Sequence, residues 1–578
     1  MRNFKKSCVY QIYPKSFQDT NGDGIGDLNG VMEKLDYLKL LGVDFLWLTP
    51  FFLSPQNDNG YDIQDYCRID PLFGTMEDLE KLIAEAGRRD MGLMLDMVFN
   101  HTSTSHEWFQ RALKGEKKFQ DYYFFKDGRA GNPPTNWQSK FGGSVWEYEE
   151  ALGKYYLHLF DSTQADLNWD NREVREEIKK VLRFWKEKGI RGFRFDVINL
   201  VSKPDPWEDD EEGDGRRFYT DGPRIHEYLR EIVEDTGLDS EDIITVGEMS
   251  STTIGHCIRY TRPEEKQLKM CFNFHHLKVD YKDGDKWSLM PWDFEELKKI
   301  FHTWQAGMAR GNGWNAVFWC NHDQPRAVSR FGNDGPYREQ SAKMLATVIH
   351  GMRGTPFIYQ GEEIGMTNGH FTDISLYRDV ESLNYFQILK EQGRKEEEIY
   401  RILQERSRDN GRTPMQWGAG ENAEFTHGIP WIGVNENYKE INAEESLARE
   451  DSVFYYYRRL IGLRKQYDVI SDGSYEPVLM EHKEIFAYKR SLHGEKLLVF
   501  ANFTGWEAEA EADETLDSWK VLLSNDERTQ IRGKRLVLEP YGAIMLYRRE
   551  PASDSQGVLH QDFSSHEDQD QASEELGL

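Results

Sequence analysis

The chain has 578 residues, with 72 basic and 100 acidic side chains and a formal charge of −28. That length exceeds what one compact core usually fills, and 13% aromatic residues argue against disorder, so we expect two or three folded domains. The acidic balance argues against a nucleic-acid partner, because phosphate backbones demand a basic face.

The cysteines and the N-terminus indicate a cytoplasmic protein. The five cysteines include no pair at CxxC spacing, so neither a zinc ribbon nor a redox dithiol is suggested, and free buried thiols are the expected state. Residues 1–13 are basic but lack the long apolar run and cleavage site of a signal peptide. No stretch approaches the ~18 continuous apolar residues of a membrane span. We therefore expect a cytoplasmic monomer with no membrane partner.

Eight short apolar runs alternate with amphipathic stretches along most of the chain. Runs that are apolar on both faces are typical of parallel strands buried on both sides. The amphipathic stretches Val31–Leu41, Met76–Asp90 and Arg172–Lys188 predict helices between them. Eight strands that alternate with helices indicate an α/β fold, a (β/α)8 TIM barrel. The predicted strands are Val9–Tyr13, Phe45–Thr49, Leu93–Val98, Gly192–Val197, Ile243–Glu248, Met270–Phe274, Ala316–Asn321 and Pro356–Gln360.

Two changes in residue composition and pattern divide the chain into domains. Residues 101–171 are rich in Gly, Pro, Asn, Trp and Tyr and predict an irregular subdomain inserted after strand three. From about residue 475, short alternating runs predict a C-terminal antiparallel β-sandwich that ends at 549. The catalytic barrel would then comprise 1–100 and 172–474, and we expect the acidic tail 550–578 to be disordered.

Three carboxylates follow predicted barrel strands at the end where such barrels carry active sites. They are Asp196 after strand four, Glu248 after strand five and Asp323 after strand seven. Buried carboxylates are costly to crowd together unless a function needs them. The matching chemistry is glycoside hydrolysis, in which one carboxylate attacks the anomeric carbon and a second carboxyl protonates the leaving oxygen. Structural ion pairing or a metal site are the alternatives.

The segments DMVFNH, GFRFDVINL, ITVGEMSS and FWCNHD resemble, in order, the four signature segments of the α-amylase superfamily, glycoside hydrolase family 13. This resemblance implies that Asp196 is the nucleophile, Glu248 the general acid/base and Asp323 the stabiliser of the transition state. The family retains anomeric configuration, which requires the first two carboxyl groups to lie about 5–5.5 Å apart and Glu248 to have a raised pKa. Subsite −1 would be completed by His101 and His322, which would bind the sugar, and by Arg194, which would orient Asp196.

Two further segments resemble the exo-acting α-glucosidases of this superfamily. In Asp58-Asn-Gly-Tyr61-Asp62 and Arg408-Asp-Asn-Gly-Arg412, the resemblance implies that Asp62 and Arg412 pair and bind the non-reducing hydroxyls, with Tyr61 beside them. A surface ion pair is the alternative. Val197, after the nucleophile, resembles the residue found in enzymes that cut α-1,6 or α-1,1 linkages.

A loop after the first strand carries oxygen ligands at alternate positions, as the front of an EF-hand does. Gly30 stands where the bidentate glutamate of an EF-hand would be, so this is a calcium-type loop without that motif. A glycine-rich turn without metal is the alternative. The predicted structural Ca²⁺ ligands are Asp19, Asn21, Asp23, the carbonyl of Ile25, and Asp27. No organic cofactor is expected.

The wider match is to superfamily members that hydrolyse trehalose 6-phosphate, a small phosphorylated disaccharide. Supporting segments begin at Asn136 and Glu212, and the most telling one is Phe274–Tyr281, where oligo-1,6-glucosidases carry acidic residues. A phosphomonoester needs cationic partners. Lys278 is the first candidate, followed by His275, while Lys282 and Lys286 read equally well as solvated surface residues. The alternatives are an oligo-1,6-glucosidase and a catalytically inactive transporter subunit, against which the intact carboxylates argue.

Overall fold

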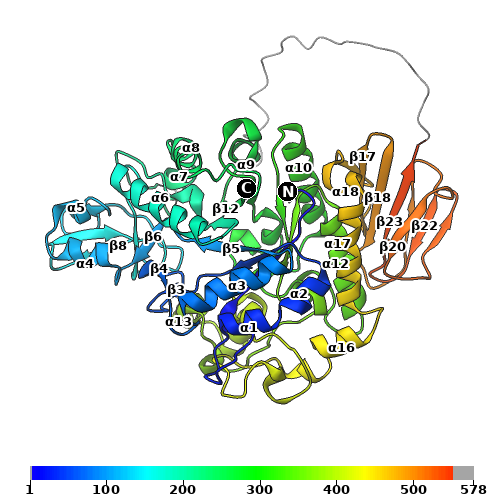
Figure 1. The fold of residues 1–578 in the computed structure, drawn as a ribbon, viewed down its shortest axis with the longest axis horizontal. Coiled ribbons are helices and arrows are strands. Elements are labelled where there is room, and N and C mark those ends of the chain that lie inside the picture. Colours follow the sequence, from blue (N-terminus) through cyan, green and yellow to red (C-terminus); the bar gives the residue numbers. More distant parts are fainter. Residues whose placement is uncertain (1–2, 212, 551–578) are drawn as a thin grey trace, which may run out of the picture.

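The computed structural model describes residues 3–211 and 213–550, so all but the first residue of the predicted acidic tail 550–578 lies outside the described residues. Figure 1 shows a barrel at the centre, with the segment between β5 and α6 on one side and the C-terminal sheets on the opposite side. Within the described residues, no helix combines the length and apolar character needed to cross a bilayer.

Eight parallel strands form the barrel, as predicted. Their order in the sheet is β13-β12-β11-β5-β2-β1-β15-β14. A parallel bridge between Cys271 and Asn315 joins the two edges of this sheet and closes the barrel. The strands are β1 (Val9–Ile12), β2 (Phe45–Leu48), β5 (Gly92–Met97), β11 (Gly192–Phe195), β12 (Ile244–Glu248), β13 (Met270–Phe272), β14 (Ala316–Val317) and β15 (Thr355–Tyr359).

The predicted strands were correct in place but several were too long. The prediction for strand seven was wrong beyond Val317, because the apolar run Phe318–Cys320 is buried in the loop after β14 and not in the sheet. A continuous apolar run gives the same sequence pattern in a buried strand and in a buried loop. Asn321 to Asp323 therefore sit on that loop at the rim.

Helices surround the barrel and agree with the amphipathic stretches, with one exception. The predicted helix over 31–41 is two helices, because the N–H of Lys34 bonds back to the carbonyl of Val31, which tightens and ends α1. The helices around the strands are α1 (Leu28–Glu33), α2 (Leu35–Leu41), α3 (Met76–Arg88), α6 (Arg172–Glu187), α7 (Arg216–Tyr219), α8 (Ile225–Thr236), α9 (Ile254–Thr261), α10 (Phe294–Arg310), α11 (Ala327–Phe331), α12 (Arg338–Gly351), α13 (Val380–Glu391), α14 (Glu396–Arg406), α15 (Asp409–Arg412), α16 (Ala443–Ala448), α17 (Val453–Gln466) and α18 (Asp468–Asp472).

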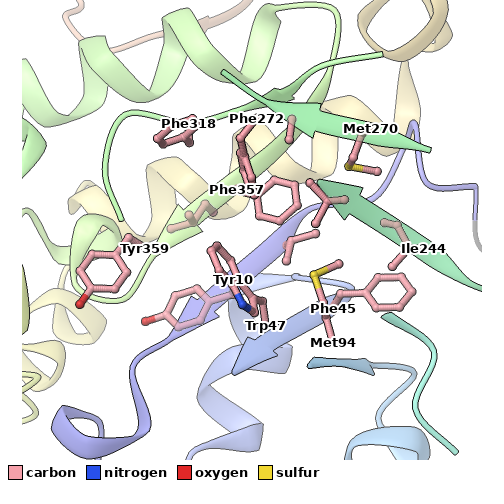
Figure 2. Close-up of a cluster of buried hydrophobic side chains, with 14 of the residues drawn as sticks. Tyr10, Phe45, Trp47, Met94, Ile244, Met270, Phe272, Phe318, Phe357 and Tyr359 are labelled. Carbon is pink, nitrogen blue, oxygen red and sulfur yellow. The ribbon is translucent and has the colours of Figure 1, made fainter. Parts of the chain in front are cut away.

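Large aromatic side chains fill the barrel interior (Figure 2). The ring of Phe272 lies 4.6 Å from that of Phe357, 5.2 Å from Phe318 and 5.7 Å from Trp47, measured between centroids. All four side chains are buried. Bulky side chains make such a barrel a packed core and not a pore, so a ligand can reach the rim residues only from the carboxyl end of the strands.

The segment between β5 and α6 adds small antiparallel sheets and two short helices beside the barrel rim. β6 pairs with β10, and β9 lies between β7 and β8. A small apolar cluster around Trp137 and Trp146 packs this segment against Val197 and Leu200, which follow β11. The elements are β6 (His101–Ser103), α4 (Glu107–Leu113), α5 (Lys117–Gln120), β7 (Phe125–Lys126), β8 (Trp146–Glu149), β9 (Lys154–Leu157) and β10 (Gln164–Asp166), while β3 (Phe52–Leu53) and β4 (Asp65–Ile69) form a hairpin after β2.

The C-terminal domain consists of two antiparallel sheets, as predicted. The order is β16-β17-β18-β23-β20 in the larger sheet and β19-β22-β21 in the smaller one, with Phe500 and Leu536 among the buried residues between them. The other face of β17 contacts the barrel, where the hydroxyl of Tyr488 donates to the carbonyl of Val348 on α12. The strands are β16 (Glu476–Val478), β17 (Ile485–Leu492), β18 (Glu495–Asn502), β19 (Ala508–Glu511), β20 (Lys520–Ser524), β21 (Gln530–Arg532), β22 (Arg535–Leu538) and β23 (Ala543–Arg549).

Candidate active site

Two carboxylates from neighbouring strands meet on one arginine. Asp196 directly follows β11, and Glu248 is the last residue of β12, which pairs with β11 in parallel. Arg194 donates from one terminal nitrogen to Asp196 at 2.6 Å and forms an ion pair with Glu248 through the other. Because the guanidinium is a rigid fork, the two carboxyl groups are held side by side. Val197, at φ 35°, turns the chain sharply after Asp196.

Arg194 is held in place by a buried acid, Asp96. Asp96 on β5 accepts a hydrogen bond of 2.6 Å from the same terminal nitrogen that reaches Asp196. The indole of Trp47 and the hydroxyl of Tyr61 also donate to Asp96, at 3.2 and 3.0 Å. Burial, with the charge of Asp196 acting in the same direction, raises the pKa of Asp96 to about 7, while Arg194 and Tyr61 counteract that effect by stabilising its charged form. The network fixes the orientation of Arg194.

Asp323 lies on the loop after β14 and faces two arginines. Arg412 lies 2.9 Å and Arg408 3.3 Å from the same carboxylate oxygen. Burial acts to raise the pKa of Asp323, but His322 and then Arg408 and Arg412 outweigh it and hold that pKa well below its usual range. Asp323 is therefore ionised at any working pH and supplies the fixed negative charge that an oxocarbenium-like transition state requires.

Both predicted histidines lie at this site in the neutral form. Burial lowers the pKa of His322 to about 3 and also lowers that of His101. The amide of Gln11 donates to Nδ1 of His322, which leaves Nε2 carrying the proton, 3.3 Å from Asp323. The ring of Tyr61 stacks on His322 at 5.2 Å and 4°. Neutral imidazoles suit hydrogen bonding to hydroxyl groups.

The predicted pair of Asp62 and Arg412 is wrong in this structure. Asp62 is fully buried and accepts hydrogen bonds from the hydroxyl of Ser54 and from the backbone amides of residues 57 and 58, so it shapes the loop. Asp58 lines the pocket instead and lies 3.3 Å from Arg408. Burial raises the pKa of Asp58 to about 7 despite that arginine. The sequence could not decide between two aspartates on either side of one turn.

A pocket of about 460 Å³ is lined by two groups of charged residues, of which we name the carboxylate-rich group the inner end and the cation-rich group the outer end. The inner end holds Asp196, Glu248 and Asp323, together with Tyr61, His101, Asp58 and Arg408. The outer end holds three cationic side chains, Lys140, Arg216 and Lys278, with Ser250 and Asp214 beside them. Phe141, Phe160, Tyr281 and Tyr385 also line the pocket, and their ring faces suit contact with a sugar.

The three cations influence one another and come from distant parts of the sequence. Burial, followed by Arg216, lowers the pKa of Lys278, and the same two causes lower that of Lys140 to about 8. Lys140 also lies 3.3 Å from the hydroxyl of Ser250. Asp214 forms an ion pair of 2.6 Å with Arg216, which leaves an excess of positive charge at this end.

The remaining phosphate candidates do not supply this charge. His275 is buried against Trp304, at 4.7 Å between ring centroids, and burial lowers its pKa to about 4. It is neutral and is not among the residues that line the pocket, so it adds no positive charge there. Lys286 lines the pocket but is neutralised by Glu381 at 2.6 Å, and Lys282 is exposed elsewhere.

Sequence reasoning missed Lys140 and Arg216, although a signal for both was present. The segment that begins at Asn136 contains Lys140, and Arg216 directly follows the segment that begins at Glu212. In the structure the backbone amide of Asn136 donates to Asp209, and the indole of Trp137 donates to the carbonyl of Glu208. These bonds tie the two loops together and bring Lys140 next to Arg216.

The predicted calcium loop is a chain of turns closed by its own oxygens. Asp19 accepts from the amides of Asn21, Gly22 and Gly24, Asp23 accepts from that of Ile25, and Asp27 caps α1. Asp23 keeps acceptor capacity for a hard cation, whereas each carboxylate oxygen of Asp19 and Asp27 already accepts two hydrogen bonds. Within the described residues, the acidic groups that lie close enough together to hold a metal ion are Glu176, Glu231 and Asp235, which are outside this loop. Calcium binding there stays a prediction.

Comparisons with known proteins agree with this geometry. The family model "Alpha amylase, catalytic domain" matches residues 11–473, and the model "Alpha-amylase SusG C-terminal domain" matches 485–545. The chain is 58% identical to trehalose-6-phosphate hydrolase of Bacillus subtilis, over 95% of this chain and 98% of that protein. It is 49% identical to oligo-1,6-glucosidase of Bacillus cereus, over 94% and 98%. The crystal structure of Bacillus licheniformis trehalose-6-phosphate hydrolase superposes with a TM-score of 0.91 at 56% identity, over 95% and 100%. This chain therefore belongs to the α-amylase family of glycoside hydrolases.

Proposed function

We propose that the protein hydrolyses α,α-trehalose 6-phosphate to glucose and glucose 6-phosphate, with retention of configuration. The observation that carries this proposal is the pocket with carboxylates at one end and an excess of cations at the other. A phosphomonoester carries about −1.5 to −2 charges at neutral pH, which the outer end would bind. The relatives named for this activity, at 58% and 52% identity, support the same substrate.

Asp196 and Glu248 would divide the first half of the reaction. Asp196 attacks the anomeric carbon of the glucose bound at the inner end, while Glu248 protonates the oxygen that leaves with glucose 6-phosphate. Asp323 would stabilise the positive charge that develops on the sugar ring. Asp196 and Glu248 share Arg194, which holds their carboxyl groups close together, and this closeness supports direct attack and not inversion.

Water completes the second half. Glu248, now ionised, takes a proton from a water molecule that attacks the glucosyl ester of Asp196, and glucose leaves in its original configuration. The pairs Asp58–Arg408 and Asp323–Arg412 close the inner end, so that one glucose unit fits at a time. That closure supports an exo-acting enzyme.

Other assignments are proposed on similar grounds. The substrate would be an intracellular metabolite, which supports a cytoplasmic location. The Asp19–Asp27 loop would hold a structural calcium ion through Asp19, Asn21, Asp23, Ile25 and Asp27. A monomer is proposed because the active site is complete within one chain.

Oligo-1,6-glucosidase activity is the second candidate, favoured by relatives at 49–50% identity. The two are separated by comparing kcat/KM for trehalose 6-phosphate and for isomaltose with the full-length protein. We expect trehalose 6-phosphate to be the better substrate. Lys278→Met should lower kcat/KM for trehalose 6-phosphate about 10- to 100-fold, because a charge-assisted hydrogen bond is lost, while Lys282→Met should not. Equal or better turnover of isomaltose would contradict the proposal.

A further inference from the structure

A buried cluster of one acid and two arginines lies next to the reaction pocket without lining it. Asp280 accepts two hydrogen bonds from Arg330, at 2.7 and 2.8 Å, and one of 2.6 Å from Arg406 at the end of α14. All three residues are buried. Burial acts to raise the pKa of Asp280, but Arg330 and then Arg406 outweigh it and lower that pKa. The cluster is therefore ionised.

Stability alone does not account for such a cluster. Taking charges out of water costs roughly what their attraction returns, so a buried ion cluster seldom stabilises a fold more than well-packed apolar residues do. The cluster does supply direction, because a guanidinium is a rigid fork whose N–H groups point along fixed lines. The partners of Arg330 other than Asp280 show which parts of the protein this fork holds in place.

Arg330 connects two segments that carry residues of the reaction pocket. One terminal nitrogen donates to the side-chain oxygen of Gln324 at 2.8 Å, and the other donates to the backbone carbonyl of Leu277. Gln324 lines the pocket from the loop after β14. Leu277 directly precedes Lys278, a cation of the outer end, on the segment after β13. One side chain outside the pocket lining thus fixes the two segments relative to each other.

The position of Lys278 depends on its backbone. Residues 275–278 form a single helical turn, and the last carbonyls of a helix lack partners within it. Arg330 satisfies one of these carbonyls, that of Leu277. Within the part of the chain that the structure describes, the charge of Lys278 is influenced by burial and by Arg216, and no carboxylate pairs with it. Because no ion pair holds the ammonium group, the backbone decides where this charge lies.

Tyr281, which also lines the pocket, is held by the same cluster. Its amide donates to the carbonyl of Lys278 at 3.0 Å, and Arg406 donates to the carbonyl of the preceding Asp280 at 2.9 Å. The ring of Tyr281 lies 5.7 Å from the guanidinium of Arg330 and 5.8 Å from that of Arg406. The backbone and the ring of this residue are therefore both fixed from outside the pocket.

We propose that Arg330, together with Asp280 and Arg406, is a positioning group that sets the preference of the pocket for phosphorylated substrates. It holds Lys278 where the phosphate of the substrate arrives, and it does so without contacting the substrate. The proposal rests on the proposed function, since it assumes a phosphate bound at Lys278. It deepens that function because it assigns part of the substrate preference to residues that lie outside the pocket. A displacement of about 1 Å at such a distance from the chemistry can cost about 10²-fold in rate.

The test uses the full-length protein and the ratio of kcat/KM for trehalose 6-phosphate to kcat/KM for p-nitrophenyl α-glucoside, which carries no phosphate. Arg330→Lys keeps the charge but loses the fork. The ratio should fall about tenfold or more, mainly through KM for trehalose 6-phosphate, as the loss of one charge-assisted hydrogen bond implies. Asp280→Asn should lower the ratio in the same direction, and it serves as the second variant if Arg330→Lys does not fold.

The matched control is another buried arginine. Arg464 donates to the carbonyl of Gly354, which precedes β15 and so lies at the end of the barrel away from the pocket. Arg464→Lys should lower Tm but leave the ratio unchanged. A general loss of stability, which lowers both activities together, is thereby separated from a loss of positioning.

A double-mutant cycle shows whether Arg330 acts through Lys278. In a Lys278→Met background, Arg330→Lys should lower the ratio little further, because residues that act as one unit are not additive. Full additivity would overturn the inference. So would an unchanged ratio in folded Arg330→Lys and Asp280→Asn, which would leave the cluster a purely structural role. If the unmodified protein releases nitrophenol but does not cleave trehalose 6-phosphate, the proposed function itself is refuted.

Discussion

Asp196 and Glu248 both bind the guanidinium of Arg194, one on each terminal nitrogen. The parallel register of β11 and β12, in which Phe195 stands opposite Gly247, brings the two acids to the same height on the rim. The shared arginine holds the two carboxyl groups close together. The arrangement therefore favours attack by the carboxylate of Asp196 on the sugar. Besides the stereochemistry of the reaction, four further predictions about the protein can be measured.

The role of Glu248 as general acid predicts a dependence on the leaving group. Glu248→Gln removes the proton donor but keeps the size of the side chain, so kcat/KM for trehalose 6-phosphate should fall about 10²–10⁴-fold. With p-nitrophenyl α-glucoside the first displacement should be much less affected, because a nitrophenolate needs little protonation to leave. A burst of nitrophenol measured by rapid mixing checks this. Equal losses with both substrates would contradict the assignment.

The outer cations predict a pH dependence that only the phosphorylated substrate shows. Lys140 has a pKa of about 8, lowered first by burial and then by Arg216, with Lys278 and Lys203 acting in the same direction and Asp214 against them. Above pH 8 the free enzyme loses this charge, so kcat/KM for trehalose 6-phosphate should decline as pH rises.

The controls for this prediction are a neutral substrate and a permanent cation. p-Nitrophenyl α-glucoside, which carries no phosphate, should not show the decline between pH 8 and 9. Lys140→Arg keeps its charge across that range, because a guanidinium is always protonated, and should abolish the decline. A decline that persists in Lys140→Arg would assign it to another group.

Asp58 and Asp62 lie on the loop between β3 and β4, and replacing each of them by asparagine should have different effects. Asp58 lines the pocket beside Arg408, whereas Asp62 accepts backbone amides of its own loop. Asp58→Asn should lower kcat/KM by about 10²-fold, as expected when one partner of a buried charge pair is removed, with a small change in Tm. Asp62→Asn should mainly lower Tm. Activity assays and thermal unfolding on both variants decide, and the reverse order would restore Asp62 as the sugar ligand.

Calcium in the Asp19–Asp27 loop predicts a metal-dependent stability. Adding CaCl2 after treatment with EGTA should raise Tm by a few degrees, because a ligand that binds only the folded state stabilises it. Asp23→Ala should lose this response. Asp23→Asn should keep part of it, since an amide oxygen still coordinates calcium and still accepts from the amide of Ile25. A Tm that is the same in CaCl2 and EGTA would show that the loop holds its shape with hydrogen bonds alone.

The barrel could be predicted because buried parallel strands read as continuous apolar runs, and Asp196 and Glu248 follow such runs directly. Other features depend on geometry that no local pattern carries. Asp58 and Asp62 flank the same turn, and only its hydrogen bonds show which of them faces the pocket. Lys140 meets Arg216 only because separate loops are tied together by Asn136. The position of Lys140 depends on these contacts between loops, so it could not be deduced from the spacing of residues in the sequence.

The central claim is a double displacement by Asp196 and Glu248, and the stereochemistry of the first product tests it most directly. Proton NMR during rapid hydrolysis of trehalose 6-phosphate, before mutarotation, shows which anomer of glucose is released from the inner end of the pocket. The account predicts α-glucose as the initial product, with β-glucose appearing only later. Initial release of β-glucose would show inversion by a single displacement and would contradict the account.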